Sequence, residues 1–150
     1  MRLLQSFLFF AALAAAQSSQ ADIFSSKDLQ TQAQDLVIKN GTYADKALAR
    51  YSNHYLLIVK REETGSSELH EHEADIFVAQ SGEGSIVTGG KIVGGHTTKA
   101  GEIRGSSIEG GERHRIAAGD VIHIPAGTAH QLVLNKGKPF TYFVVKVTGQ

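Results

Sequence analysis

Hydrophobic and polar residues alternate along the chain after residue 44, and turn-forming residues interrupt the alternation at short, regular intervals. A period of two is typical of strands that bury one face, and regular turns are typical of an all-β barrel or sandwich. The expected strands cover residues 47–51, 55–61, 74–80, 85–88, 103–108, 121–124, 130–134 and 140–147. No segment repeats another, so the pattern predicts one barrel and not two fused barrels.

The last expected strand, FTYFVVKV, is apolar on both faces. A strand with one solvated face has no need of a second apolar face. A homodimer that buries the excess is the expected explanation, and packing within the core of the same chain is the alternative.

One segment before the barrel, residues 25–39, changes to helical spacing of its apolar residues. Ser25 and Asp28 can cap its start, and Asn40-Gly41 is expected to stop it. We expect a helix that packs on the outside of the barrel. A lid or a dimer arm is the alternative.

Residues 1–21 have the pattern of a secretory signal peptide, because Arg2 and an apolar stretch are followed by small residues. The apolar stretch is short for a bilayer, which needs about 20 residues, so an uncleaved anchor is the less favoured reading. We expect a secreted or periplasmic protein made of a signal peptide (1–21), a helical segment (22–43) and a barrel domain (44–150).

The composition narrows the possible partners. The 150 residues suit a single domain with a real core, and 15 basic and 15 acidic side chains leave no formal net charge. No basic patch calls for a nucleic acid, and no membrane contact is expected beyond the signal peptide. The absence of cysteine excludes disulfides and lipoprotein attachment.

Candidate chemistry centres on residues 119–135, where two apolar runs flank a turn made by Pro125 and Gly127. Such a hairpin places His130 at the start of a strand, with its imidazole directed into the space that the hairpin encloses.

An earlier run, ELHEHEAD, supplies two more imidazoles, because His70 and His72 would share one face of a strand. Three imidazoles and a carboxylate that converge from two strands are a recurrent way to hold a divalent transition metal. Iron, manganese, nickel, copper and zinc all accept such ligands, so the residues do not choose among them.

These two segments resemble the two motifs of the cupins, a family of small β-barrels. The second motif is matched by Gly119-x5-Pro125-x-Gly127-x2-His130, and the first is resembled by His70-x-His72, Asp75 and Gly82. Asp75 stands where the family usually has Glu, on a shorter spacer, and Glu73 is the alternative carboxylate. The resemblance covers residues 44–147. It implies a single cupin barrel, or jelly roll, with a metal on His70, His72, Asp75 and His130.

The metal is expected at one end of an apolar cavity, because Phe77 and Ala79 share the face of Asp75 and two leucines share that of His130. Glu73, His123 or Tyr142 would move a proton if the site is catalytic. Arg104 either pairs with a substrate carboxylate or lies on a solvated edge strand.

Two functions are carried forward from these residues. The first is a metal-dependent enzyme (a dioxygenase, isomerase or lyase) that acts on a small oxygenated molecule. The alternative is a non-catalytic module that binds a small ligand or a metal. A storage protein with a vestigial site is the third and least favoured, because the histidines are intact.

Overall fold

The computed structural model describes residues 20–150, so the predicted signal peptide lies outside the described residues apart from its last two. One helix precedes thirteen strands in the described part of the chain. The elements are α1 (Ser26–Asp35), β1 (Tyr43–Arg50), β2 (His54–Arg61), β3 (Ser67–His70), β4 (Glu73–Ser81), β5 (Glu83–Thr88), β6 (Lys91–Val93), β7 (His96–Lys99), β8 (Glu102–Gly105), β9 (Ser107–Glu109), β10 (Glu112–Ala117), β11 (Val121–Ile124), β12 (His130–Val133) and β13 (Phe140–Thr148).

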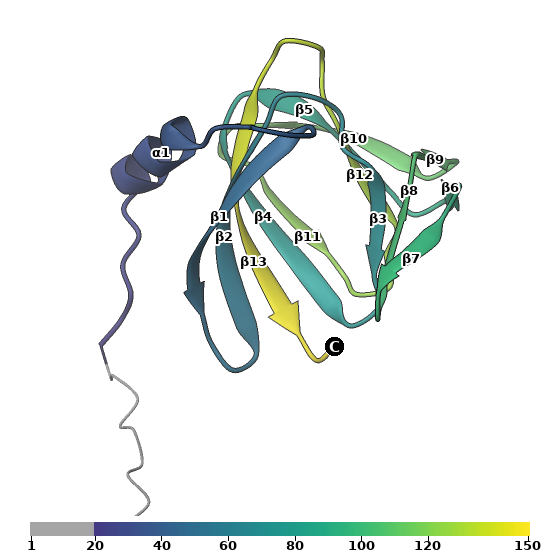
Figure 1. Cartoon of the computed structure of the whole chain (residues 1–150), viewed down its shortest axis with the longest axis horizontal. Helices are drawn as coiled ribbons and strands as arrows, with labels where there is room; N and C mark the ends of the chain where they lie inside the picture. The colour runs from purple at the N-terminus through teal and green to yellow at the C-terminus, as the bar shows by residue number, and fades with distance from the viewer. Residues whose placement is uncertain (1–19) are drawn as a thin grey trace, which may run out of the picture.

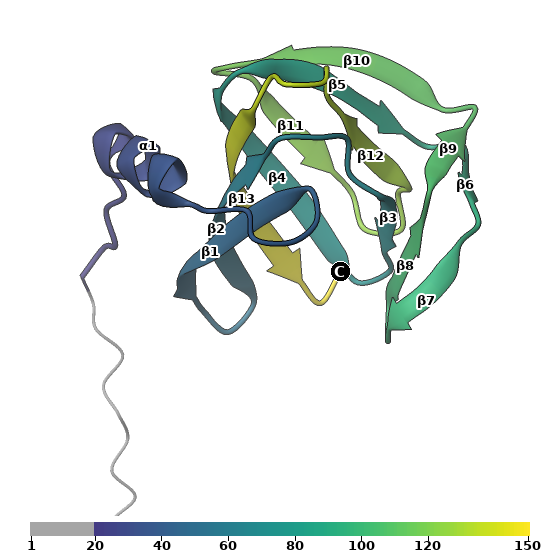
Figure 2. The same cartoon turned by 45° about the horizontal axis from the view of Figure 1, so that its top comes forward.

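The strands form two large sheets that enclose one interior, as Figures 1 and 2 show. One sheet has the order β1-β2-β13-β4-β11, and the other has the order β10-β5-β12-β3-β8-β7. A two-stranded sheet, β6-β9, lies at the side of the barrel opposite α1. All the strand pairs are antiparallel. The predicted all-β barrel with a short N-terminal helix is confirmed.

The core lies between the two sheets and follows from the alternation along the strands. In β4, Asp75, Phe77 and Ala79 are buried on the inner face, while the residues between them are half-buried on the outer face. Leu132 and Leu134 join the same core from the other side, as predicted. Buried apolar area of this kind, at roughly 25 cal/mol per Å², is the main stabilising contribution in a chain without disulfides.

Helix α1 packs on the outside of the barrel, as expected. The Ser25 side chain accepts a hydrogen bond from the Asp28 backbone N–H at 3.1 Å and caps the start. Leu29 and Ala33 then bury against Ile58 on the outer face of β2. No helix among residues 20–150 has the length and apolarity that a membrane span requires.

The helix is shorter than predicted, because it ends at Asp35 and Leu36 already has an extended backbone (φ −68°, ψ 122°). The β-branched pair Val37-Ile38 follows, and such residues lose side-chain freedom in a helix. Leu36 nevertheless packs with the helix cluster, which explains why the apolar spacing continued past the true end.

The apolar second face of β13 has a partial explanation within the chain. Phe143 on that face packs with the helix cluster, and β13 lies in the middle of its sheet between β2 and β4. The homodimer stays a prediction.

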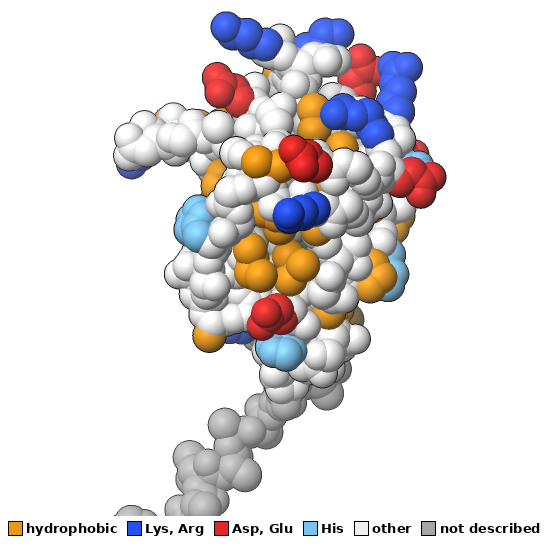
Figure 3. Space-filling view, turned by 90° about the vertical axis from the view of Figure 1, so that its right-hand side faces the viewer, with side chains coloured by type: hydrophobic (Ala, Val, Ile, Leu, Met, Phe, Trp, Pro, Cys, Tyr) orange, Lys and Arg blue, Asp and Glu red, His pale blue; other side chains and the backbone are white. Residues whose placement is uncertain are grey.

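The region between Gly89 and Ala117 departs most from the sequence-based expectation. The predicted strand 103–108 is two strands in different sheets, β8 and β9, and β6, β7 and β10 were not predicted. These strands are short, and β10 has one buried residue, Ile116. Figure 3 faces this side of the molecule and shows hydrophobic side chains surrounded by charged ones.

Candidate metal centre

Two neighbouring strands of the six-stranded sheet bring a carboxylate and two imidazoles together. Glu68 and His70 are two apart on β3 and share its inner face. His130 on β12 is the cross-strand partner of Glu68. One ligand atom from each of these three residues lies within 4.8 Å of the other two. The imidazole Nε2 atoms of His70 and His130 each lie 3.7 Å from an oxygen of the Glu68 carboxylate.

The orientation of His130 is fixed by its other ring nitrogen. Nδ1 lies 3.0 Å from the Thr128 carbonyl oxygen, and because a carbonyl only accepts, Nδ1 carries the proton. In the neutral imidazole Nε2 then presents a lone pair, and this buried atom has no hydrogen-bond partner among the described residues. A backbone acceptor on the far nitrogen is the usual arrangement around an imidazole that binds a metal.

The turn before His130 is tied to β3. Gly127 has φ 73°, which favours glycine, and its backbone N–H donates to the His70 carbonyl at 2.7 Å. The Pro125-x-Gly127 turn of the second motif therefore sets the position of His130 relative to His70.

Asp75 lies beside this cluster and is paired with a lysine. Asp75 on β4 faces Lys146 on β13 across the sheet, and the Lys146 Nζ lies 2.7 and 2.8 Å from its two oxygens. The same ammonium donates to His70 Nε2 at 2.9 Å. Asp75 Oδ2 is 3.6 Å from the Nε2 atoms of both His70 and His130. The carboxylate is near the imidazoles, and the ammonium holds both of its oxygens.

A second ion-pair group closes the other side of His70. Arg104 on β8 donates to Glu102 at 2.7 Å and pairs with Glu68 at 2.8 Å. Burial raises the pKa of Glu102, but hydrogen bonds from Arg104 and Thr98 outweigh it and lower the pKa to about 2. Glu102 Oε2 in turn lies 3.6 Å from His70 Nδ1.

The local charges act on the protonation of the cluster. Burial raises the pKa of Glu68, but the positive charges of protonated His130, of Arg104, of protonated His70 and of Lys146 outweigh it, so the net pKa lies below its usual range; Arg104 and Lys146 keep their charge when the imidazoles are neutral. Burial and the Lys146 ammonium lower the pKa of His70, against the opposing effect of the nearby carboxylates. An ionised carboxylate and a neutral imidazole are the forms that bind metals. The cluster of Glu68, His70 and His130 could therefore bind a metal ion.

The structure does not bring His72 to this cluster. β3 ends at His70, and His72 lies in the bend before β4 with an exposed side chain. The shared-face argument therefore fails beyond His70. Applied in the other direction along β3, the same argument would have found Glu68, which the sequence analysis missed. A ligand role for His70, Asp75 and His130 stays a prediction.

The remaining predicted side chains divide between the cavity and the surface. Glu73 accepts a hydrogen bond from Tyr55 at 3.2 Å, at the edge of the cavity. His123 is exposed on the outer face of β11, because Ile122 and Ile124 turn inward. Burial raises the pKa of Tyr142, so its hydroxyl stays protonated and is not available as a base. Arg104 lines the cavity and is half-buried, so it is not a fully solvated residue of an edge strand.

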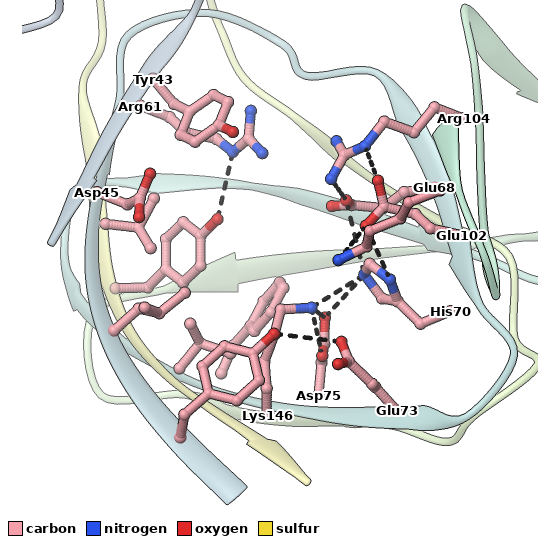
Figure 4. A pocket seen from close by; sticks show the side chains of 17 residues that line it. Tyr43, Asp45, Arg61, Glu68, His70, Glu73, Asp75, Glu102, Arg104 and Lys146 are labelled. Carbon is pink, nitrogen blue, oxygen red and sulfur yellow. Dashed lines mark hydrogen bonds and ion pairs between the residues drawn. The ribbon is translucent and has the colours of Figure 1, made fainter. Parts of the chain in front are cut away.

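Two members of this candidate cluster, Glu68 and His70, line one cavity of about 160 Å³, which Figure 4 shows, and His130 is not among its lining residues. Apolar residues of β2, β4 and β13, such as Phe77 and Val144, form part of its wall. Charged residues, three tyrosines and His70 form the rest, so the cavity is less apolar than predicted. The reason is that β2, β8 and β13 each direct a cationic side chain inward: Arg61, Arg104 and Lys146.

The comparisons with known proteins identify the fold. No family model matches the chain, and no curated protein matches it. Among solved structures, an uncharacterized conserved protein with a double-stranded β-helix domain from Klebsiella pneumoniae aligns over 87% of this chain and 93% of its own, with a TM-score of 0.59 and 17% identity. The cupin domain of Cnp3 from Schizosaccharomyces pombe aligns over 75% of this chain and 69% of its own, with a TM-score of 0.56 and 10% identity.

KdgF from Halomonas sp. is also similar, over 75% of this chain and 86% of its own, with a TM-score of 0.54 and 16% identity. Identities this low carry the fold and not the activity. The chain thus has the cupin fold, a double-stranded β-helix, with a buried cluster of two histidines and one glutamate that could bind a metal ion.

Proposed function

We propose that this protein is an extracytoplasmic, metal-binding cupin that acts as a metal-dependent enzyme on a small oxygenated molecule. Glu68, His70 and His130 would hold the metal. Two imidazoles and one carboxylate with open positions are typical of non-haem iron oxygenases, which favours the dioxygenase among the three predicted reaction classes. A divalent metal in such a site acts as a Lewis acid toward an oxygen atom of the ligand.

The observation that carries the proposal is the buried Nε2 of His130, which has no hydrogen-bond partner within residues 20–150. A buried polar atom without a partner costs about 1–3 kcal/mol, and its position beside Glu68 gives it a natural partner in a cation. The proton on Nδ1, held by Thr128, keeps the lone pair directed at the cluster.

Lys146 is the side chain placed to serve a bound ligand. Its ammonium has three donors, and in the structure they are directed at Asp75 and at His70 Nε2. If His70 Nε2 held a metal, its lone pair would not be available to Lys146. One donor of the Lys146 ammonium would then be free for the ligand, while Asp75 would continue to hold the side chain.

The test is elemental analysis of residues 22–150, purified without chelators. The matched variants are His130→Ala, which removes a proposed ligand, and His123→Ala, which removes an exposed histidine of the outer face. We expect about one transition metal per chain in the wild type and in His123→Ala, and none in His130→Ala. Metal retained in both variants would contradict the site.

A second candidate function, a metal-independent ligand-binding module, has one observation in its favour. The Lys146 ammonium already supplies a cation next to Asp75 and His70. If the purified protein contains no metal and acquires none from added iron, manganese, nickel, copper or zinc, this second function replaces the first.

A further inference from the structure

Arg61 is a buried cation that lines the same cavity. It is not one of the candidate metal ligands Glu68, His70 and His130. It is the last residue of β2, is 5% exposed, and directs its guanidinium into the cavity (Figure 4). Its Nε donates to the Tyr142 hydroxyl at 3.3 Å. The ring of Tyr43 covers it, with 4.7 Å between the guanidinium carbon and the ring centroid.

No carboxylate among residues 20–150 forms an ion pair with Arg61. The contrast with Arg104 is direct, since that guanidinium pairs with both Glu68 and Glu102. A buried charge is normally paired, because removing it from water is costly. The terminal nitrogens of Arg61 therefore present N–H donors to the cavity, and the Glu68 carboxylate stabilises the positive charge only from beyond ion-pair distance.

The position of this guanidinium is fixed by the backbone beside it. A Cβ atom at Gly65 would lie 2.4 Å from the Nη1 of Arg61, so the guanidinium packs directly against this glycine. The Gly65 carbonyl accepts a hydrogen bond from the Gln131 side chain at 2.8 Å, and its N–H donates to Leu132. These bonds hold the Gly65 backbone in place beside the guanidinium of Arg61.

We propose that Arg61, assisted by the Tyr142 hydroxyl, binds the carboxylate group of the ligand. The Tyr142 oxygen accepts from Arg61, which leaves its proton free to donate to an anion. A guanidinium presents two parallel N–H groups that match the two oxygens of a carboxylate. This proposal rests on the proposed function in one respect, since the remaining oxygen atoms of the same ligand would face Glu68, His70 and His130.

A carboxylate fits this site better than a phosphate. A single unpaired guanidinium balances one negative charge, and the next guanidinium in the cavity is already neutralised by two carboxylates. A cavity of about 160 Å³ is below the roughly 300–1,000 Å³ of sites for drug-sized molecules, so the ligand is small. The substrate class is therefore a small oxygenated monocarboxylate.

The experiment is an NMR titration of metal-free protein with glycolate, with its neutral amide glycolamide, and with inorganic phosphate. Glycolate can chelate a metal, and such binding could be mistaken for binding at Arg61. Metal-free protein removes this possibility, so the result does not depend on whether the proposed metal binds. The wild type should bind glycolate at least tenfold more tightly than either competitor. Equal affinity for glycolate and glycolamide, or tighter binding of phosphate, would overturn the proposal.

Three variants locate the binding. Arg61→Gln should lose at least tenfold in glycolate affinity, and Arg113→Gln, an exposed arginine of β10, should lose nothing. Gly65→Ala keeps the charge but displaces the guanidinium, so it should also weaken binding. The Gly65→Ala variant still tests the role of Arg61 if the Arg61→Gln protein does not fold. Wild-type affinity in a folded Arg61→Gln or Gly65→Ala protein would contradict the assignment.

Discussion

Replacing Lys146 with methionine tests whether its ammonium compensates the buried charge of Asp75 when no metal is bound. The Asp75 side chain is 2% exposed and that of Lys146 is 14% exposed, and their contacts of 2.7 and 2.8 Å are short. Removing one partner of a buried pair costs about 3–5 kcal/mol, because the other charge stays buried and uncompensated. A domain is stabilised by only about 5–15 kcal/mol in total, so this is a large fraction.

The expected result for metal-free Lys146→Met is a melting temperature about 10 °C or more below that of the wild type, since 1 kcal/mol shifts a domain of this size by a few degrees. A divalent cation would restore the missing positive charge beside Asp75. Zinc should therefore raise the melting temperature of the variant more than that of the wild type. The zinc affinity of the variant should also be higher, because the ammonium no longer competes for His70.

The matched control is Lys138→Met, which breaks an exposed pair with Glu83 at 3.7 Å. Exposed pairs are screened by water and contribute little, so this variant should melt within a few degrees of the wild type, with or without zinc. Both proteins are measured by calorimetry with a chelator and then with saturating zinc. If zinc raises the melting temperature of Lys146→Met no more than that of the wild type, the ammonium and the metal do not compete for one site and the reasoning is refuted.

Three further predictions concern other residues. Glu68→Gln should lower zinc affinity at least tenfold in a calorimetric titration, whereas Glu73→Gln should leave it unchanged. The reverse order would give the carboxylate role to Glu73, the alternative to Asp75 in the sequence analysis. Ile58→Ala should lower the free energy of unfolding by about 2–5 kcal/mol in a denaturant titration, because Ile58 is 0% exposed under α1. A loss below about 1 kcal/mol would mean that the helix is not firmly packed on the barrel. The pKa of Glu102 is lowered from 4.5 to about 2, so its contribution to stability is complete above about pH 4.5 and is lost as the pH falls toward 2. Glu102→Gln should therefore flatten the plot of melting temperature against pH in this range. An unchanged slope would contradict the assignment.

The sequence predicted the barrel because its evidence is local and periodic. The alternation in β4, the Pro125-x-Gly127 turn and the two isoleucines of β11 each specify a face or a bend without reference to distant residues. The short strands β6 to β10 were missed or merged because they carry few buried residues, and a strand that buries little shows little alternation.

The candidate site could be predicted only in part from the sequence. His70 and His130 were found from their motifs, but His72 was placed on a strand that ends two residues earlier. The partners of the site depend on cross-strand register, which a single sequence does not reveal. Lys146 faces Asp75 only because β13 pairs with β4 in this register, and Glu68 faces His130 for the same reason.

The measurement that most directly tests the central claim is anomalous diffraction from a crystal of metal-loaded protein, recorded at the absorption edge of the metal found by elemental analysis. The account predicts one strong peak within coordination distance of the Nε2 atoms of His70 and His130 and of the Glu68 carboxylate. A peak beside His72 instead, or no peak within reach of His130, would contradict it.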